Sequence, residues 1–130
     1  MGKGFYQVPI ASCEPVQSFA PGSIEREVTL TEYSKMMSEV IDIPIYIGSE
    51  EIRTNDLAAI TPPHKHQHVV GHYHKGNASH AKKAIKAALD AKKDWSNMRW
   101  EHRASIFLKA ADLLAGPFRA RMNAATMVAQ

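Results

Sequence analysis

"IPIYIGSEEIRT", residues 43–54, is the stretch that decides the fold class. Apolar residues alternate with other residue types before Gly48 and Ser49, and this period of two is typical of a β-strand. A short Gly-Ser connection between two such runs is typical of a tight turn, so the stretch predicts a β-hairpin. The residues expected to share one face of its first strand are Ile43, Ile45 and Ile47.

Two further short strands are predicted after the hairpin. "LAAITPP", residues 57–63, reads as a strand that Pro62 and Pro63 stop, because proline donates no hydrogen bond to a sheet. "HQHVVGHYHKG", residues 66–76, has β-branched and aromatic residues at its centre, as strands prefer.

A helical period precedes the hairpin. Ser23 can cap a helix over residues 23–42, because a serine hydroxyl accepts a bond from a free amide of the first turn. The apolar positions of this helix are Ile24, Val28, Met36, Met37 and Val40. Residues 1–22 show no sustained periodicity and contain three prolines, so we expect an extended arm there.

After Gly76 the pattern is helical to the last residue. Asn77 can cap a helix to about Trp95, and a second helix is expected from about Trp100 to Ala115. Residues expected to be buried in the second helix are Ile106, Phe107, Ala110, Leu113 and Leu114. Gly116 suits a left-handed position after that helix, and Pro117 suits the first turn of a third. The third helix has no terminator before Gln130, so we expect a piece of a larger protein.

Composition narrows the class of protein. The 130 residues are 45% apolar and 22% charged, which is typical of one ordinary globular domain. The net charge of +3 comes from lysines and arginines spread along the chain, whereas nucleic-acid binders concentrate such charge. No apolar run is long enough to cross a membrane, and the N-terminus shows no signal or transit pattern. We therefore expect neither nucleic-acid nor membrane partners.

Five histidines form the most conspicuous cluster: His64, His66, His68, His72 and His74. On one strand all five would project to the same face, and three of them could in principle converge on zinc. Side chains on one face of a strand point roughly parallel, however, and no cysteine or acidic residue lies nearby in the sequence as a partner. A polar solvent or interface face is favoured over a buried hydrogen-bonded role and over metal or proton chemistry.

The remaining chemistry-bearing residues give no catalytic pattern. Cys13 is the single cysteine, and its neighbours offer no positive charge that would activate a thiol. Glu50 and Glu51 are expected at an exposed hairpin tip, and Trp95 and Trp100 are expected to pack at a corner between helices. The sequence therefore predicts no catalytic, cofactor-binding or metal-ligating residue in this chain.

Several stretches together carry a family resemblance: the hairpin, residues 61–80, residues 84–130 and the proline-containing opening. Their order and spacing resemble the N-terminal region of the Δ1-pyrroline-5-carboxylate dehydrogenase branch of the aldehyde dehydrogenase superfamily. The string "PPHKHQHVVGHYHK" and the run "WSNMRWEHRASIFLKAADLL" are the most specific parts. The resemblance covers nearly the whole chain.

The resemblance implies an α/β fold that is the N-terminal portion of the aldehyde dehydrogenase fold. Its parts would be an arm (1–22), a helix (23–42), a hairpin with short strands (43–75) and the helical part of an incomplete NAD-binding domain (76–130). It also implies NAD-dependent oxidation of L-glutamate γ-semialdehyde to L-glutamate in proline catabolism, in a homo-oligomer. The enzyme would use a cysteine nucleophile, a glutamate base and an asparagine oxyanion hole, all beyond this chain.

Two expectations accompany this interpretation. The chain alone is predicted to be inactive, and the complete protein is expected in a bacterial cytoplasm, or in the mitochondrial matrix if it is eukaryotic. The alternative is a small histidine-rich module that binds a metal or docks on another protein.

Overall fold

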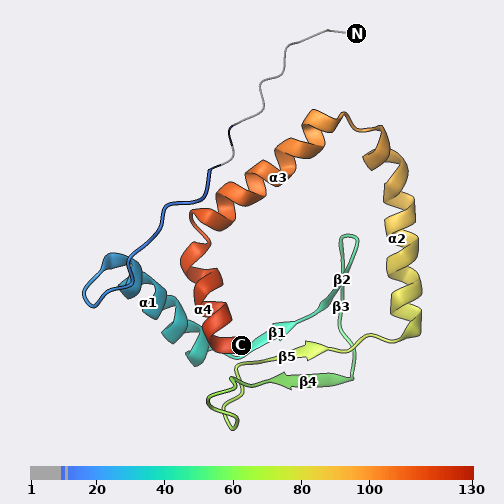
Figure 1. Cartoon of the computed structure of the whole chain (residues 1–130). Helices are drawn as coiled ribbons and strands as arrows, with labels where there is room; N and C mark the ends of the chain where they lie inside the picture. Colours follow the sequence, from blue (N-terminus) through green and yellow to red (C-terminus); the bar gives the residue numbers. More distant parts are fainter. Residues whose placement is uncertain (1–9, 11) are drawn as a thin grey trace.

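The chain forms an open ring of helices and strands (Figure 1). The computed structural model describes residues 10 and 12–130. Going along the chain, the elements are α1 (Ile24–Ser38), β1 (Ile41–Ile43), β2 (Ile45–Ile47), β3 (Glu50–Ile52), β4 (Leu57–Ile60), β5 (Gly71–His74), α2 (Ala78–Asn97), α3 (Trp100–Ala115) and α4 (Arg119–Ala129). This is the mixed helix and strand content that the sequence predicts.

Helix α1 begins where expected and ends earlier than expected. The Ser23 hydroxyl accepts a hydrogen bond from the Arg26 amide at 3.4 Å, which confirms the N-cap. The predicted helix over 23–42 was too long, because residues 41–43 form β1. The Ile41 amide donates to the Val70 carbonyl at 3.1 Å, so pairing with a distant strand replaces the last helical turn.

The isoleucine run is divided between two sheets. β2 and β3 form the predicted antiparallel hairpin, and Gly48 at its turn has a φ of 62°, which suits glycine. The expected continuous strand through Ile43, Ile45 and Ile47 is wrong, because Ile43 belongs to β1. Pro44 separates β1 from β2 and has no amide hydrogen to continue a ladder.

A three-stranded sheet lies beside the hairpin, in the order β1-β5-β4. β5 is the central strand, parallel to β1 and antiparallel to β4. β4 ends just before Thr61 and the two prolines, as predicted. β5 is much shorter than the predicted strand over 66–76, because residues 62–68 form turns with bonds such as Lys65 amide to Pro62 carbonyl.

α2 and α3 follow the predicted boundaries closely, whereas α4 begins at Arg119, so Pro117 precedes that helix rather than lying in its first turn as expected. Asn77 caps α2, and α3 runs from Trp100 to Ala115. Gly116 is not left-handed as expected, since its φ is −104°. A Cβ there would lie 2.9 Å from the Asp112 carbonyl oxygen, so glycine is needed because the backbone approaches the helix end closely.

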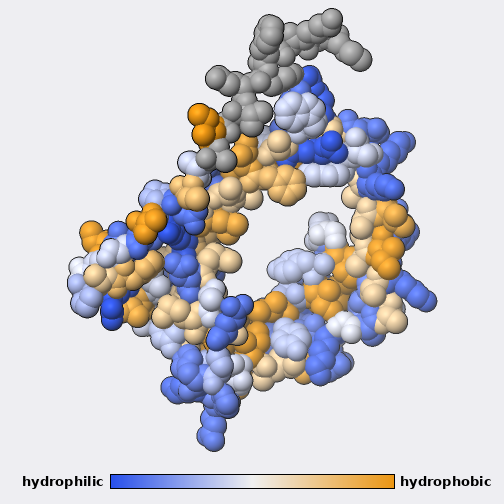
Figure 2. All heavy atoms as spheres, viewed as in Figure 1, coloured by the Kyte–Doolittle hydropathy of each residue, from blue (hydrophilic) through white to orange (hydrophobic). Residues whose placement is uncertain are grey.

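The core lies at one side of the ring. α1 packs against α4, where Ala124 and Val128 are buried together with Thr29. Most apolar residues of α3 that were expected to be buried are exposed: Phe107 is 66% exposed, and only Leu113 among them is half-buried. None of the described elements covers that face of α3, and Figure 2 shows that apolar residues border an opening through the ring.

Candidate functional site

The histidine string does not form one face, because its members reach different elements. The imidazole of His64 lies 2.9 Å from the Tyr33 hydroxyl and stacks on that ring. The Nε2–H of His68 donates to the carbonyl of Met37 near the C-terminal end of α1, at 2.7 Å. In residues 10 and 12–130, no group of three or more histidine, cysteine, aspartate or glutamate side chains is placed to hold a metal ion.

A chain of hydrogen bonds joins the hairpin to the three-stranded sheet. Arg53, which follows β3, donates from Nε to Asp42 Oδ2 at 2.9 Å and from Nη1 to Glu51 Oε2 at 3.0 Å. The Tyr46 hydroxyl donates to Glu51 Oε1 at 2.9 Å, and His74 Nε2 donates to Asp42 Oδ1 at 3.0 Å. These five side chains, which we call the hairpin network, come from β1, β2, β3, the residue after β3, and β5.

The network sets the protonation of its acidic members. The hydrogen bond from Arg53 holds the pKa of Asp42 below its ordinary value, and the bond from Tyr46 does the same for the pKa of Glu51. The Glu51 carboxylate in turn raises the pKa of the Tyr46 hydroxyl. Glu51 is thus already bound on both oxygens, so it offers no free base beside Glu50.

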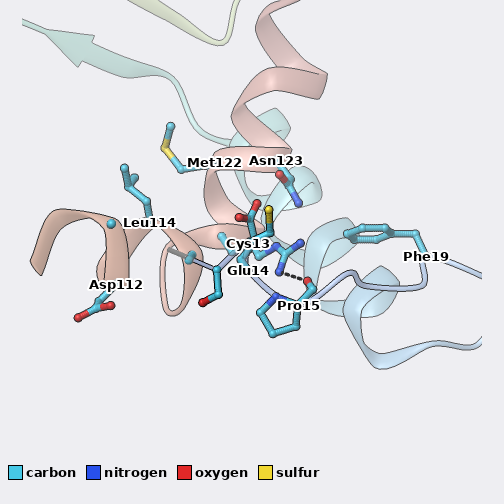
Figure 3. A pocket seen from close by; sticks show the side chains of 12 residues that line it. Cys13, Glu14, Pro15, Phe19, Asp112, Leu114, Met122 and Asn123 are labelled. Carbon is cyan, nitrogen blue, oxygen red and sulfur yellow. Dashed lines mark hydrogen bonds between the residues drawn. The ribbon is translucent and has the colours of Figure 1, made fainter. Parts of the chain in front are cut away.

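Cys13 borders a pocket of about 800 Å³. The pocket lies between the arm and the α3–α4 corner. The Arg119 guanidinium donates to the Pro15 carbonyl at 2.8 Å, the bond drawn as a dashed line at Pro15 in Figure 3. Acidic groups that border it are Glu14 and Asp112. The thiol is exposed, and no histidine is among the residues that line the pocket. The arrangement lacks the neighbouring base that a cysteine nucleophile uses.

Unpaired apolar surface is the dominant feature of α2 and α3. The exposed large apolar residues of these two helices include Ile85, Leu89, Ile106, Phe107, Leu108 and Leu114. The accessible surface of the chain is 10570 Å². A compact protein of this mass exposes about 6,800 Å², by the usual scaling of surface with mass. The chain therefore exposes more surface than a compact protein of its mass.

A smaller apolar groove of about 260 Å³ lies between α1, α4 and the three-stranded sheet. Its apolar lining consists of Met36, Ile41, Ile43, Ile60, Val70, Ala125, Val128 and Ala129. This groove and the exposed faces of α2 and α3 are surfaces suited to packing rather than to catalysis.

Two helix N-termini of the described residues can be compared with a nucleotide phosphate site. A dinucleotide usually places its phosphates at a helix N-terminus with free amides. At α2 those amides are occupied, because the Asn77 side chain accepts from the amides of Ser79 and His80, at 3.0 and 3.2 Å. α3 begins after Arg99 with no side-chain cap, but no glycine-rich loop precedes it. Neither of these two N-termini therefore presents a glycine-rich loop with free amides to the phosphates of NAD.

Residues 49–127 match the aldehyde dehydrogenase family. The chain belongs to this family. Among curated aldehyde dehydrogenase relatives, the Δ1-pyrroline-5-carboxylate dehydrogenase of Agaricus bisporus is 40% identical over 126 residues, which is 96% of this chain and 23% of that protein. The human mitochondrial Δ1-pyrroline-5-carboxylate dehydrogenase is 41% identical over 117 residues, which is 90% of this chain and 21% of that protein.

Solved structures of the family agree. The Δ-pyrroline-5-carboxylate dehydrogenase of Mycobacterium tuberculosis, solved with NAD bound, matches with a TM-score of 0.92 and 37% identity. The match covers 97% of this chain and 24% of that one. This aldehyde dehydrogenase chain thus spans about a quarter of the length of its relatives, and its fold is the N-terminal portion of theirs.

The sequence patterns did not predict the hairpin network. Asp42 and Arg53 stand eleven residues apart in predicted separate elements, and only the pairing of β1 with β5 brings His74 to them. The sequence offered one signal for this network, Asp42. A charged residue between isoleucines in an alternating run must face away from the apolar side of the strand.

Part of the sequence interpretation is confirmed for the tryptophans. Trp95 contacts Phe107 edge to face, with ring centroids 6.4 Å apart, which agrees with the predicted packing at the corner between α2 and α3.

In the described part of the chain, no helix is long and apolar enough to cross a lipid bilayer.

Proposed function

We propose that this chain serves in an NAD-dependent dehydrogenase that oxidises L-glutamate γ-semialdehyde, the open form of 1-pyrroline-5-carboxylate, to L-glutamate. The observation that carries the proposal is the match to the Mycobacterium tuberculosis enzyme with bound NAD, over nearly all of this chain. The curated relatives with that name support the same substrate.

The role proposed for the chain itself is that of an outer frame. Residues 76–130 would contribute helices to the NAD-binding domain, and the arm, hairpin and short strands would pack around it. The exposed apolar faces of α2 and α3 support this role, because they offer packing surface that the described elements do not fill. The nucleophile, the general base and the nucleotide contacts would come from the remaining three quarters of the enzyme.

NAD would accept hydride when bound to the complete enzyme. We assign no step of hydride transfer to the residues of this chain. Its contribution to the reaction would be to cover apolar surface of the nucleotide-binding part and to exclude water from it. The expected substrate is a small molecule, and the expected assembly is a homo-oligomer. The expected compartment is a bacterial cytoplasm, or the mitochondrial matrix if the source is eukaryotic; the name of the human relative places that protein in mitochondria.

A chimeric enzyme tests the proposal. Residues 1–130 replace the corresponding N-terminal quarter of the Mycobacterium tuberculosis dehydrogenase, and NADH formation is measured with 1-pyrroline-5-carboxylate and with propanal. The unmodified enzyme is the matched control. We expect the chimera to reduce NAD with 1-pyrroline-5-carboxylate and to prefer it over propanal as the control does. A folded chimera with no activity, or with a reversed substrate preference, would contradict the proposal.

A further inference from the structure

His74 is the member of the histidine string that the proposed function leaves unexplained. It is the last residue of β5, and its side chain is only 7% exposed. Its Nε2 reaches Asp42 Oδ1 of β1 at 3.0 Å. Its Nδ1 lies 2.6 Å from the backbone nitrogen of Thr54 and 2.8 Å from the backbone oxygen of the same residue. One buried imidazole therefore joins β5 to β1 and to the segment that leaves the hairpin.

A single ring nitrogen cannot bind both backbone groups of Thr54 at once. A neutral imidazole that carries its proton on Nε2 donates to Asp42 and accepts the Thr54 amide at Nδ1. An imidazolium carries protons on both nitrogens, so Nδ1 must donate to the Thr54 carbonyl instead. The bond to Asp42 is the same in both states. Uptake of one proton thus exchanges the backbone partner of the hairpin segment.

We propose that His74 is a proton-dependent latch that selects how the segment after the hairpin is held against the three-stranded sheet. The imidazole contacts Asp42 of β1. Arg53 and Glu51 belong to the same network, His72 pairs with Asp42 in the β1–β5 ladder, and Asp56 and Lys75 form an ion pair beside Thr54. The inference rests on contacts inside this chain and is independent of the proposed function.

The side chains near His74 favour an exchange between its neutral and protonated states in which only the Thr54 partner changes. Asp42 stays ionised because Arg53 holds its pKa low, so it accepts from His74 whether or not the ring is charged. Asp56 and Lys75 form an ion pair at 3.3 Å and therefore offset each other. The Thr54 hydroxyl lies 3.1 Å from the Asp56 carbonyl and 3.2 Å from the Lys75 carbonyl and can donate to either, so this contact does not depend on the His74 proton.

Protonation of His74 changes the hydrogen bonding of one backbone amide, that of Thr54. With neutral His74 the Thr54 amide is bound and protected from exchange with solvent. With protonated His74 that amide loses its acceptor, and the carbonyl gains a donor. Loss of one hydrogen bond corresponds to about a fivefold change in an opening equilibrium.

The test is hydrogen exchange at the Thr54 amide, measured by NMR on the 130-residue chain at pH 5 and pH 8 and corrected for intrinsic rates. We expect protection about fivefold lower at pH 5. His74→Gln should abolish this pH dependence, because glutamine does not titrate. His72→Gln, on the same strand, should keep it. Equal protection at both pH values, no protection at either, or pH dependence that survives His74→Gln would overturn the latch.

A second variant decides the matter if His74→Gln fails to fold. Asp42→Asn keeps an oxygen for the Nε2–H and removes the negative charge that favours the imidazolium. The pH at which the Thr54 amide signal changes should fall in this variant. An unchanged transition would overturn the proposal.

Discussion

Gly71→Ala should weaken the three-stranded sheet at its centre. Gly71 begins β5 and pairs with Ile41 of β1 on one side and Ile60 of β4 on the other. A Cβ at this position would lie 2.7 Å from Ile41 Cγ1 and 2.8 Å from the Ile41 carbonyl oxygen. Real Cβ atoms do not approach a backbone oxygen so closely, and a backbone cannot rotate away as a side-chain tip can. β1 must therefore shift.

Overpacking of this kind costs about 1 to 3 kcal/mol, which is about a 5-fold to 150-fold change in the local opening equilibrium. The assay is hydrogen exchange of the Ile41 amide, which donates to the Val70 carbonyl at 3.1 Å in the unmodified chain. Gly76→Ala is the control, since its Cβ would meet Ile45 Cδ1 at an ordinary 3.5 Å. It should change stability by less than about 1 kcal/mol. Equal exchange at Ile41 in both variants would refute the parallel pairing of β1 with β5.

Three further predictions concern other parts of the molecule. The pKa of Asp42 lies below its ordinary 3.8 because of Arg53, so the folded chain binds fewer protons at Asp42 than the unfolded chain. The contribution of Asp42 to stability should therefore be full above pH 3.8 and disappear as the pH falls through the lowered pKa. Asp42→Asn should reduce the loss of stability at acid pH, measured as the midpoint of urea unfolding at each pH. His68→Ala removes the bond to the Met37 carbonyl and should destabilise α1 by about 1 kcal/mol, measured by urea unfolding followed by circular dichroism, whereas substituting the exposed His66 should be neutral. Zinc measured in protein purified without added metal should be well below one equivalent, and EDTA should leave the melting temperature unchanged.

Local patterns predicted the elements that depend on nearby residues. The serine and asparagine caps, the Gly48 turn and the stop at Pro62 all act within a few residues, so the sequence contains the information needed for them. The division of the isoleucine run at Pro44 depended on which strand β1 would pair with. That partner, β5, lies about thirty residues away, and periodicity does not reveal it.

The histidines illustrate the same limit for a site. The sequence prediction of one long strand placed all five histidines on one face. Turns after Pro62 instead place His64 beside Tyr33 and His68 beside the end of α1.

Burial of α3 was overestimated for a different reason. An apolar helical stripe predicts that something covers it, but the covering group need not lie in the 130 residues that carry the stripe.

The central claim is that α2 and α3 present apolar faces that the rest of a dehydrogenase fills. Hydrogen exchange of both helices, measured before and after addition of the complementary three quarters of the Mycobacterium tuberculosis enzyme, tests it most directly. We predict weak protection of α2 and α3 in the chain alone, a rise of at least about tenfold on mixing, and NADH formation from 1-pyrroline-5-carboxylate only in the mixture. Full protection of α3 in the isolated chain, with no change on mixing, would contradict the account.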